Sequence, residues 1–167
     1  VCYDAISGRE LWNHEYEARL DDPMGGPGPR ATPTLANGML FATGATGAFM
    51  RLDPVTGEEV WRKELKEVSG QELPMWGFSS SPLVVGTNVM VWAGGPGEKD
   101  LLAFDVESGD LRWSVAAGSD TYSSPQLSTI AGEDLVLMLS NGGLVLVEPA
   151  TGKVRLNYEW AFSGYRA

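Results

Sequence analysis

One stretch decides the fold of this 167-residue chain: Arg51-Leu52-Asp53-Pro54-Val55-Thr56-Gly57-Glu58-Glu59-Val60-Trp61. Its central Asp-x-x-Ser/Thr-Gly segment recurs at residues 4–8, 53–57 and 105–109, and with an initial glutamate at 148–152. The glycines of successive copies lie 49, 52 and 43 residues apart. Four residues after the glycine stand Trp12, Trp61 and Trp113 in the first three copies, and Leu156 in the fourth. A repeat of this length is the signature of an architecture built from similar units.

A second marker repeats at a similar interval: Ala31-Thr32-Pro33, Ser80-Ser81-Pro82 and Ser123-Ser124-Pro125. After each proline come a short β-rich run, a turn and a second run, which predicts a hairpin. A third run follows, and the Asp-x-x-Ser/Thr-Gly turn leads to a fourth. In that turn the acidic or hydroxyl side chain can accept backbone N–H bonds while glycine supplies the positive φ. Four antiparallel strands in about 45 residues are the pattern of one propeller blade.

The repeats predict an all-β fold, a partial β-propeller of four-stranded antiparallel blades. Residues 1–20 are expected to hold the last two strands of one blade, and residues 30–70, 79–117 and 122–160 to form full blades. Propellers normally close with about four to eight blades. We therefore expect an open arc of about three and a half blades with two uncovered faces, next to the remaining blades of a parent propeller. The chain begins at Val1 without an initiator methionine or a basic, apolar leader, which predicts a fragment.

Composition and charge argue against several functional classes. The formal net charge of −10 repels a nucleic-acid backbone or an anionic membrane at long range. No apolar run is longer than Leu135-Val136-Leu137-Met138-Leu139, which has the length of a strand and is too short for a membrane span. The single cysteine, Cys2, forbids a disulfide or a cysteine metal cage within the chain. The sequence thus predicts no nucleic-acid partner and no membrane span.

The repeat resembles the pyrroloquinoline-quinone (PQQ)-like repeat, through the stretch ending at Trp61 and through Ala103-Phe104-Asp105-Val106-Glu107-Ser108-Gly109-Asp110-Leu111-Arg112-Trp113. In that family the tryptophan docks against the adjacent blade, which assigns Trp12, Trp61 and Trp113 a structural role. Members include quinoprotein dehydrogenases, BamB-like outer-membrane assembly lipoproteins and secreted bacterial propellers. The resemblance implies a periplasmic or secreted location.

Two functions follow from the resemblance. The first is a non-catalytic scaffold that binds a protein partner or a small ligand, with no catalytic residue, no metal and no cofactor. The alternative is a segment of a PQQ-dependent alcohol or sugar dehydrogenase whose cofactor and calcium residues lie largely elsewhere. Such dehydrogenases pair adjacent cysteines over the quinone, whereas this chain has only Cys2. We expect Cys2 to be a buried strand thiol at the position of Met50 or Leu102 in other repeats.

Three residues are the candidate binding site at the mouth of the channel: Arg30, Trp76 and Tyr122. They lie in the loops that cross from the outer strand of one blade to the innermost strand of the next, where propellers usually hold ligands. A structural role, such as pairing of Arg30 with a turn carboxylate, is the competing interpretation.

The remaining polar candidates favour structural roles. His14 is expected to be a solvated strand residue because the chain has no second histidine for a metal pair. Asp21-Asp22 lacks the spacing of a calcium loop. The glycine-rich segments 25–30 and 94–100 lack the phosphate-binding patterns.

Overall fold

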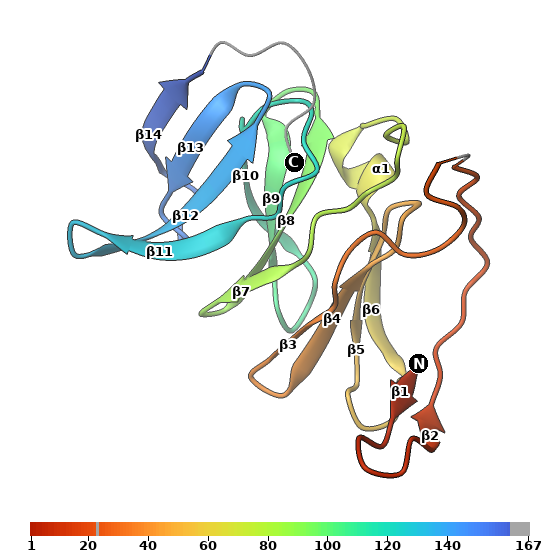
Figure 1. Ribbon diagram of the computed structural model, residues 1–167. Helices are drawn as coiled ribbons and strands as arrows, with labels where there is room; N and C mark the ends of the chain where they lie inside the picture. Colours follow the sequence, from red (N-terminus) through yellow and green to blue (C-terminus); the bar gives the residue numbers. More distant parts are fainter. Residues whose placement is uncertain (23, 161–167) are drawn as a thin grey trace.

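The computed structural model describes residues 1–22 and 24–160 (Figure 1). Fourteen strands and one short helix are assigned within these residues. The strands form one two-stranded and three four-stranded antiparallel sheets. The predicted all-β partial propeller is confirmed. No helix of the described residues approaches the length and hydropathy needed to cross a membrane.

We name the sheets by their order in the chain. The half blade contains β1 (Cys2–Tyr3) and β2 (Glu10–Trp12). The first blade contains β3 (Thr34–Ala36), β4 (Met39–Thr43), β5 (Ala48–Leu52) and β6 (Glu59–Glu64). The second blade contains β7 (Leu83–Val85), β8 (Asn88–Gly95), β9 (Lys99–Asp105) and β10 (Leu111–Val115). The third blade contains β11 (Gln126–Ile130), β12 (Glu133–Ser140), β13 (Gly143–Val147) and β14 (Val154–Glu159).

The repeated turn joins the last two strands of each sheet, and the three copies that begin with aspartate are held by the same hydrogen bonds. In the first blade, Asp53 Oδ1 accepts the N–H groups of Val55 at 2.7 Å and Thr56 at 2.9 Å. The N–H of Gly57 donates to the Asp53 carbonyl at 2.8 Å, with a φ of 77° at the glycine. A side chain is strained at that φ, which explains the glycine in this turn.

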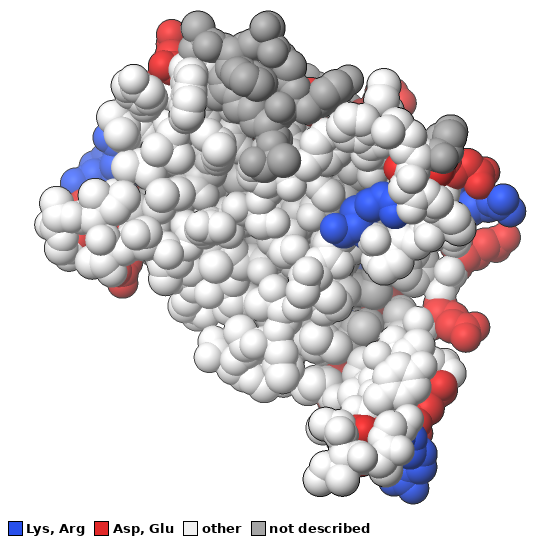
Figure 2. Space-filling view, viewed as in Figure 1, with Lys and Arg blue, Asp and Glu red and all other residues white. Residues whose placement is uncertain are grey.

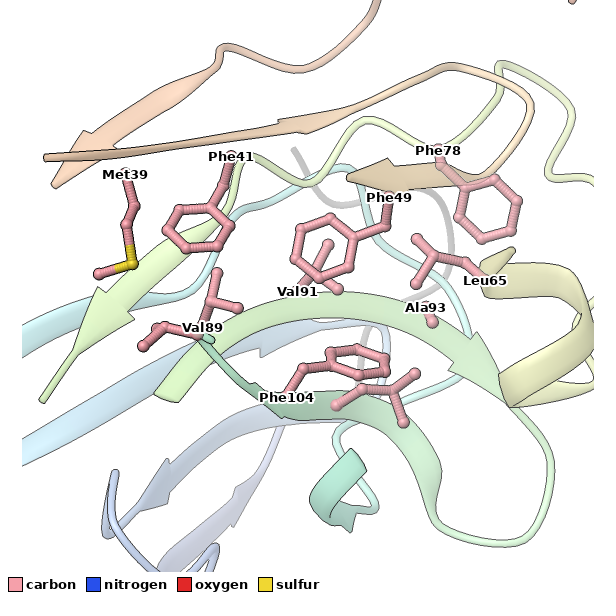
Figure 3. Packing of buried hydrophobic residues seen from close by; sticks show 11 residues of the cluster. Met39, Phe41, Phe49, Leu65, Phe78, Val89, Val91, Ala93 and Phe104 are labelled. Carbon is pink, nitrogen blue, oxygen red and sulfur yellow. The ribbon is translucent and has the colours of Figure 1, made fainter. Parts of the chain in front are cut away.

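Apolar side chains fill the spaces between the blades. Phe41 and Phe49 of the first blade point toward Val89, Val91 and Phe104 of the second blade (Figure 3). A second cluster joins the second and third blades, with Met90, Trp92, Leu101, Ala103, Val136, Met138, Val145 and Val147 among its members. A strand that neighbouring blades cover on both faces carries an almost continuous run of apolar residues. In β8, for example, all eight residues are buried.

One element was not expected from the sequence. The helix α1 (Leu65–Ser69) follows β6 and ends at Gly70, whose φ of 79° is typical of a helix C-cap. Leu65 is fully buried in the cluster between the first and second blades. The helix therefore anchors the start of the crossing loop that carries Trp76.

The structure corrects three expectations for Cys2 and His14. Cys2 lies opposite Trp12, as Arg51 lies opposite Trp61, so it occupies the position of Arg51 rather than that of Met50. The expected buried thiol is only half-buried, because its sheet has two strands. His14 follows β2 outside any strand and is half-buried, with Nε2 3.5 Å from Glu59 Oε2.

Candidate functional site: blade junctions and channel mouth

The three repeated tryptophans each reach the following blade. The indole Nε1–H of Trp12 donates to the Pro54 carbonyl at 3.1 Å, that of Trp61 to the Val106 carbonyl at 3.1 Å, and that of Trp113 to the Pro149 carbonyl at 3.2 Å. Each acceptor directly follows the acidic residue of the next blade's repeated turn. One side chain thus joins the outer strand of a blade to the turn of its neighbour.

The glycine of that turn provides the space for the indole. A Cβ atom on Gly57 would lie 2.4 Å from the Trp12 ring. The same atom on Gly109 would lie 2.8 Å from Trp61, and on Gly152 2.7 Å from Trp113. The repeated glycine is therefore required by its positive φ and by the indole that packs on it.

Two of the three predicted mouth residues meet in the structure. The rings of Trp76 and Tyr122 have centroids 5.1 Å apart and planes inclined by 45°, a favourable geometry for an aromatic pair. Ser79 Oγ donates to the Tyr122 carbonyl at 3.4 Å. The contacts join successive crossing loops and place an aromatic pair where the two loops meet.

Arg30 is fixed by its own loop. Its Nη2 donates to Asp22 Oδ2 at 3.0 Å and to the Gly26 carbonyl at 2.7 Å. Hydrogen bonds from the Met24 and Gly25 N–H groups, followed by that from Arg30, lower the pKa of Asp22. The charge of the mostly buried guanidinium is thus compensated by a turn carboxylate.

A ladder of hydroxyl groups links the crossing loops, and sequence reasoning did not identify it. Ser81 Oγ accepts the N–H of Thr32, and Ser124 Oγ accepts the N–H of Ser81, each at 2.9 Å. The sequence signal for this ladder is the hydroxyl residue that precedes the proline in every copy of the second repeated motif. This position is a junction between blades.

The innermost strands carry no charged side chain. Their sequences are Thr-Leu-Ala in β3, Leu-Val-Val in β7 and Gln-Leu-Ser-Thr-Ile in β11. Figure 2, which has the viewpoint of Figure 1, shows a mostly uncharged surface across the centre of this face, with acidic and basic side chains mainly at the margins. On the face shown, charged side chains of both signs therefore lie mainly away from the centre.

Two aspartates of β9 have opposite pKa shifts. The side-chain hydrogen bond from Arg112 and the backbone N–H groups of Ser108 and Glu107 lower the pKa of Asp105 to about 2. Burial raises the pKa of Asp100, although Asp100 Oδ2 accepts the N–H of Ala117 at 2.8 Å. Both carboxylates bind backbone groups of turns or crossing loops, which is a structural role.

The sequence matches one family profile, described as outer membrane protein assembly factor BamB, over residues 1–165. The chain belongs to this family. It is 31% identical over 147 residues to the BamB of Shewanella oneidensis, covering 82% of this chain and 34% of that protein. The fold is similar to the crystal structure of BamB from Moraxella catarrhalis, with a TM-score of 0.66 and 21% identity over 97% of this chain and 46% of the other.

Quinoproteins are also among its relatives. The chain is 32% identical over 97 residues to the quinoprotein alcohol dehydrogenase PedH of Pseudomonas putida, covering 58% of this chain and 14% of that enzyme. The 167 residues thus span about a third of the BamB relative and a smaller part of PedH.

The described residues do not by themselves supply a PQQ and calcium site. They contain no group of three His, Cys, Asp or Glu side chains that could hold a metal ion. PQQ carries carboxylates, and such charges need cationic partners when they are removed from water. The innermost strands offer none, and Arg30 is already paired with Asp22.

Proposed function

We propose that this chain is part of a BamB-like propeller that binds a protein partner at its channel mouth as a non-catalytic scaffold. The observation that carries the proposal is the Trp76–Tyr122 pair, which joins two crossing loops. Aromatic residues are the side chains that most often dominate the energetics of protein interfaces. The BamB relatives support a periplasmic or secreted location for this function.

The loop beside the pair extends this candidate surface. Leu73 and Met75 are exposed in the segment between α1 and Trp76, and Pro74 between them restricts the backbone. Two exposed large apolar side chains on a loop that a proline restricts would suit an extended apolar segment of a partner. The name of the BamB relatives points to outer-membrane proteins as that partner.

Binding to an unfolded outer-membrane protein tests the proposal. A purified β-barrel outer-membrane protein is labelled with a fluorophore, kept unfolded in urea and diluted into buffer with the chain, and its anisotropy is recorded. We expect saturable binding that Trp76→Ala and Tyr122→Ala each weaken at least fivefold. Val60→Ala, an exposed residue of the outer strand β6, is the matched control. Equal affinity of all variants would contradict a binding role for the mouth.

Oxidation of an alcohol by a quinoprotein is the second candidate, favoured by the similarity to PedH. Titration of the parent propeller, with its remaining blades, with PQQ and calcium is expected to give no binding. Tight binding with dye-linked alcohol oxidation would replace the scaffold proposal. A parent propeller that binds neither PQQ nor the unfolded protein would contradict both functions.

A further inference from the structure

The outer strands of the second and third blades each supply an arginine to the acidic residue of their own turn. Arg112 is the third residue after Gly109, and its Nη2 donates to Asp105 Oδ2 at 2.7 Å. Arg155 stands at the same position in the third blade, and its Nη1 donates to Glu148 Oε1 at 2.7 Å. Charge-assisted bonds of this kind compensate the negative charge of the turn carboxylate.

The half blade and the first blade lack this arginine. Leu11 and Val60 occupy its position. Within the part of the chain that the structure describes, Asp4 and Asp53 take part in no ion pair. Oδ1 of each aspartate accepts backbone N–H groups of its turn, as in the second blade. Oδ2 is therefore the equivalent of the atom that binds Arg112 in the second blade.

Both aspartates carry their charge at neutral pH. Hydrogen bonds from the hydroxyl and the N–H of Ser7 lower the pKa of Asp4. Hydrogen bonds from the turn backbone, first that of Thr56, lower the pKa of Asp53. The charge of Arg51 is the smallest cause of that lowering, because its guanidinium binds the next blade. Each of the two turns thus presents a carboxylate that no described side chain pairs.

The tips of the same two turns are apolar. Ile6 and Val55, two residues before the turn glycine, are 98% and 81% exposed. The equivalent residues of the second and third blades are Glu107 and Ala150. A large exposed aliphatic side chain therefore occurs at each turn that lacks the arginine, and at neither turn that has it. The rim surface is defined here by Asp4, Ile6, Asp53 and Val55.

The two turns belong to neighbouring sheets and lie at the same end of the molecule. The indole of Trp12 packs on Gly57 and donates to the Pro54 carbonyl, which joins the half blade to the turn of the first blade. In Figure 1 the turns after β1 and β5 lie at the lower end of the view, away from α1. Val60 is 50% exposed although the half blade precedes it, and Leu11 is 52% exposed. A preceding sheet therefore does not cover the position of the missing arginine.

We propose that the rim surface docks a segment of a protein partner in which arginine and apolar side chains alternate. Each arginine binds one turn aspartate through Oδ2, as Arg112 binds Asp105, and the apolar side chains cover Ile6 and Val55. Opposite charge and exposed apolar area both favour such a segment. The rim surface lies at the end of the blades opposite to the crossing loops, so this inference is independent of the proposed function.

A short peptide of alternating arginine and valine residues, labelled with fluorescein, is the probe. Its anisotropy is recorded with the parent propeller, and we expect saturable binding that weakens as salt is added, because the paired charges are exposed. Asp4→Asn/Asp53→Asn should weaken binding at least tenfold, since asparagine still accepts the N–H bonds of the turn but carries no charge. The same peptide with citrulline in place of arginine should also bind at least tenfold more weakly.

A second pair of substitutions tests the surface without changing the aspartates. Leu11→Arg/Val60→Arg gives both turns the arginine of the other blades and should weaken peptide binding at least tenfold. Val60→Ala brings no cation and should leave the affinity unchanged. Asp21→Asn/Asp110→Asn is the matched control, because it changes the net charge as much as either double variant, at two exposed carboxylates elsewhere. Its affinity should stay within twofold of that of the unmodified protein.

Circular dichroism of each variant establishes that the blades remain folded. Failure of the arginine peptide to bind, or equal binding of the citrulline peptide, would overturn the proposal. The same holds if the matched control loses as much affinity as Asp4→Asn/Asp53→Asn, or if Leu11→Arg/Val60→Arg binds the peptide as well as the unmodified protein.

Discussion

Trp61 shows how one side chain holds two blades together. Its indole donates to the Val106 carbonyl, and its ring packs on Gly109 and against Phe41 and Phe49. The hydrogen bond fixes the position of the ring, and the apolar contacts exclude water from the junction.

Substitutions at Trp61 separate these two contributions. Trp61→Phe keeps most of the packing and removes the N–H, so we expect a loss of about 1 kcal/mol in the free energy of unfolding. Trp61→Ala also leaves a cavity, and we expect a loss of about 3 to 4 kcal/mol. Urea denaturation measures both, with the exposed Val60→Ala as the control. Equal losses for the two Trp61 variants would show that packing contributes little.

The lowered pKa of Asp105 predicts an acid-sensitive contribution to the free energy of unfolding. Its pKa in the fold, about 2, is below its usual value of 3.8, so the folded state favours the carboxylate. The stabilisation is present above pH 3.8 and is lost as the pH falls toward 2. In Asp105→Asn this component of the acid destabilisation should be absent. Denaturation curves between pH 6 and 2 test this, and identical pH profiles for the two proteins would contradict it.

The pKa of Asp100 is shifted in the opposite direction, so its contribution to stability should change with pH in the opposite sense. Burial raises its pKa, so the folded state favours the protonated form more than the unfolded state does. Ionised Asp100 is therefore penalised at neutral pH, and the penalty is relieved as the pH falls through the raised pKa toward 3.8. Asp100→Asn should lack this relief in the same series of denaturation curves.

At the scale of elements, equivalent junctions are completed by different residues. Between the first and second blades, Arg51 donates to the carbonyls of Val106 and Glu107 and pairs with the Glu107 carboxylate. Between the second and third blades, Ala103 takes the place of Arg51 opposite the tryptophan. There Asn88, from another strand, donates to Pro149 and Ala150. In both junctions, a side chain therefore donates to the two carbonyls that follow the acidic residue of the turn.

The hydroxyl ladder gives a prediction for the crossing loops. Ser81→Ala removes the acceptor for the Thr32 N–H, so we expect the free energy of unfolding to fall by about 1 kcal/mol. Ser128→Ala, on an exposed position of β11, should change it by less than about 0.5 kcal/mol. Chemical denaturation of both variants is the measurement. A Ser81→Ala variant as stable as the unmodified chain would mean that water replaces the lost acceptor.

At the scale of the whole molecule, position in the arc decides what a repeat residue contributes. Tyr3 and Phe104 occupy the same repeat position, but only Phe104 is covered by a preceding blade. The stability of stacked repeats depends on such contacts between neighbours.

Alanine substitution at the two positions tests this dependence. Phe104→Ala should lower the free energy of unfolding by about 3 to 5 kcal/mol, because it leaves a cavity between two blades. Tyr3→Ala should change it by less than about 0.5 kcal/mol in the chain alone. Similar losses in urea denaturation would show that β1 is covered by another surface in solution.

The four strands of each blade and the order of the blades along the chain could be predicted from the sequence, because turn residues and short apolar runs are local signals that each repeat contains. The sequence also indicated the crossing loops and the tryptophan series. The folded arrangement was needed to show which side chains meet: that Trp76 contacts Tyr122, that Arg30 is bound by Asp22, and that Cys2 pairs with Trp12 as Arg51 pairs with Trp61. These outcomes depend on loop paths, strand register and the number of strands in each sheet. Such features arise from contacts between residues far apart in the chain, which local patterns do not encode.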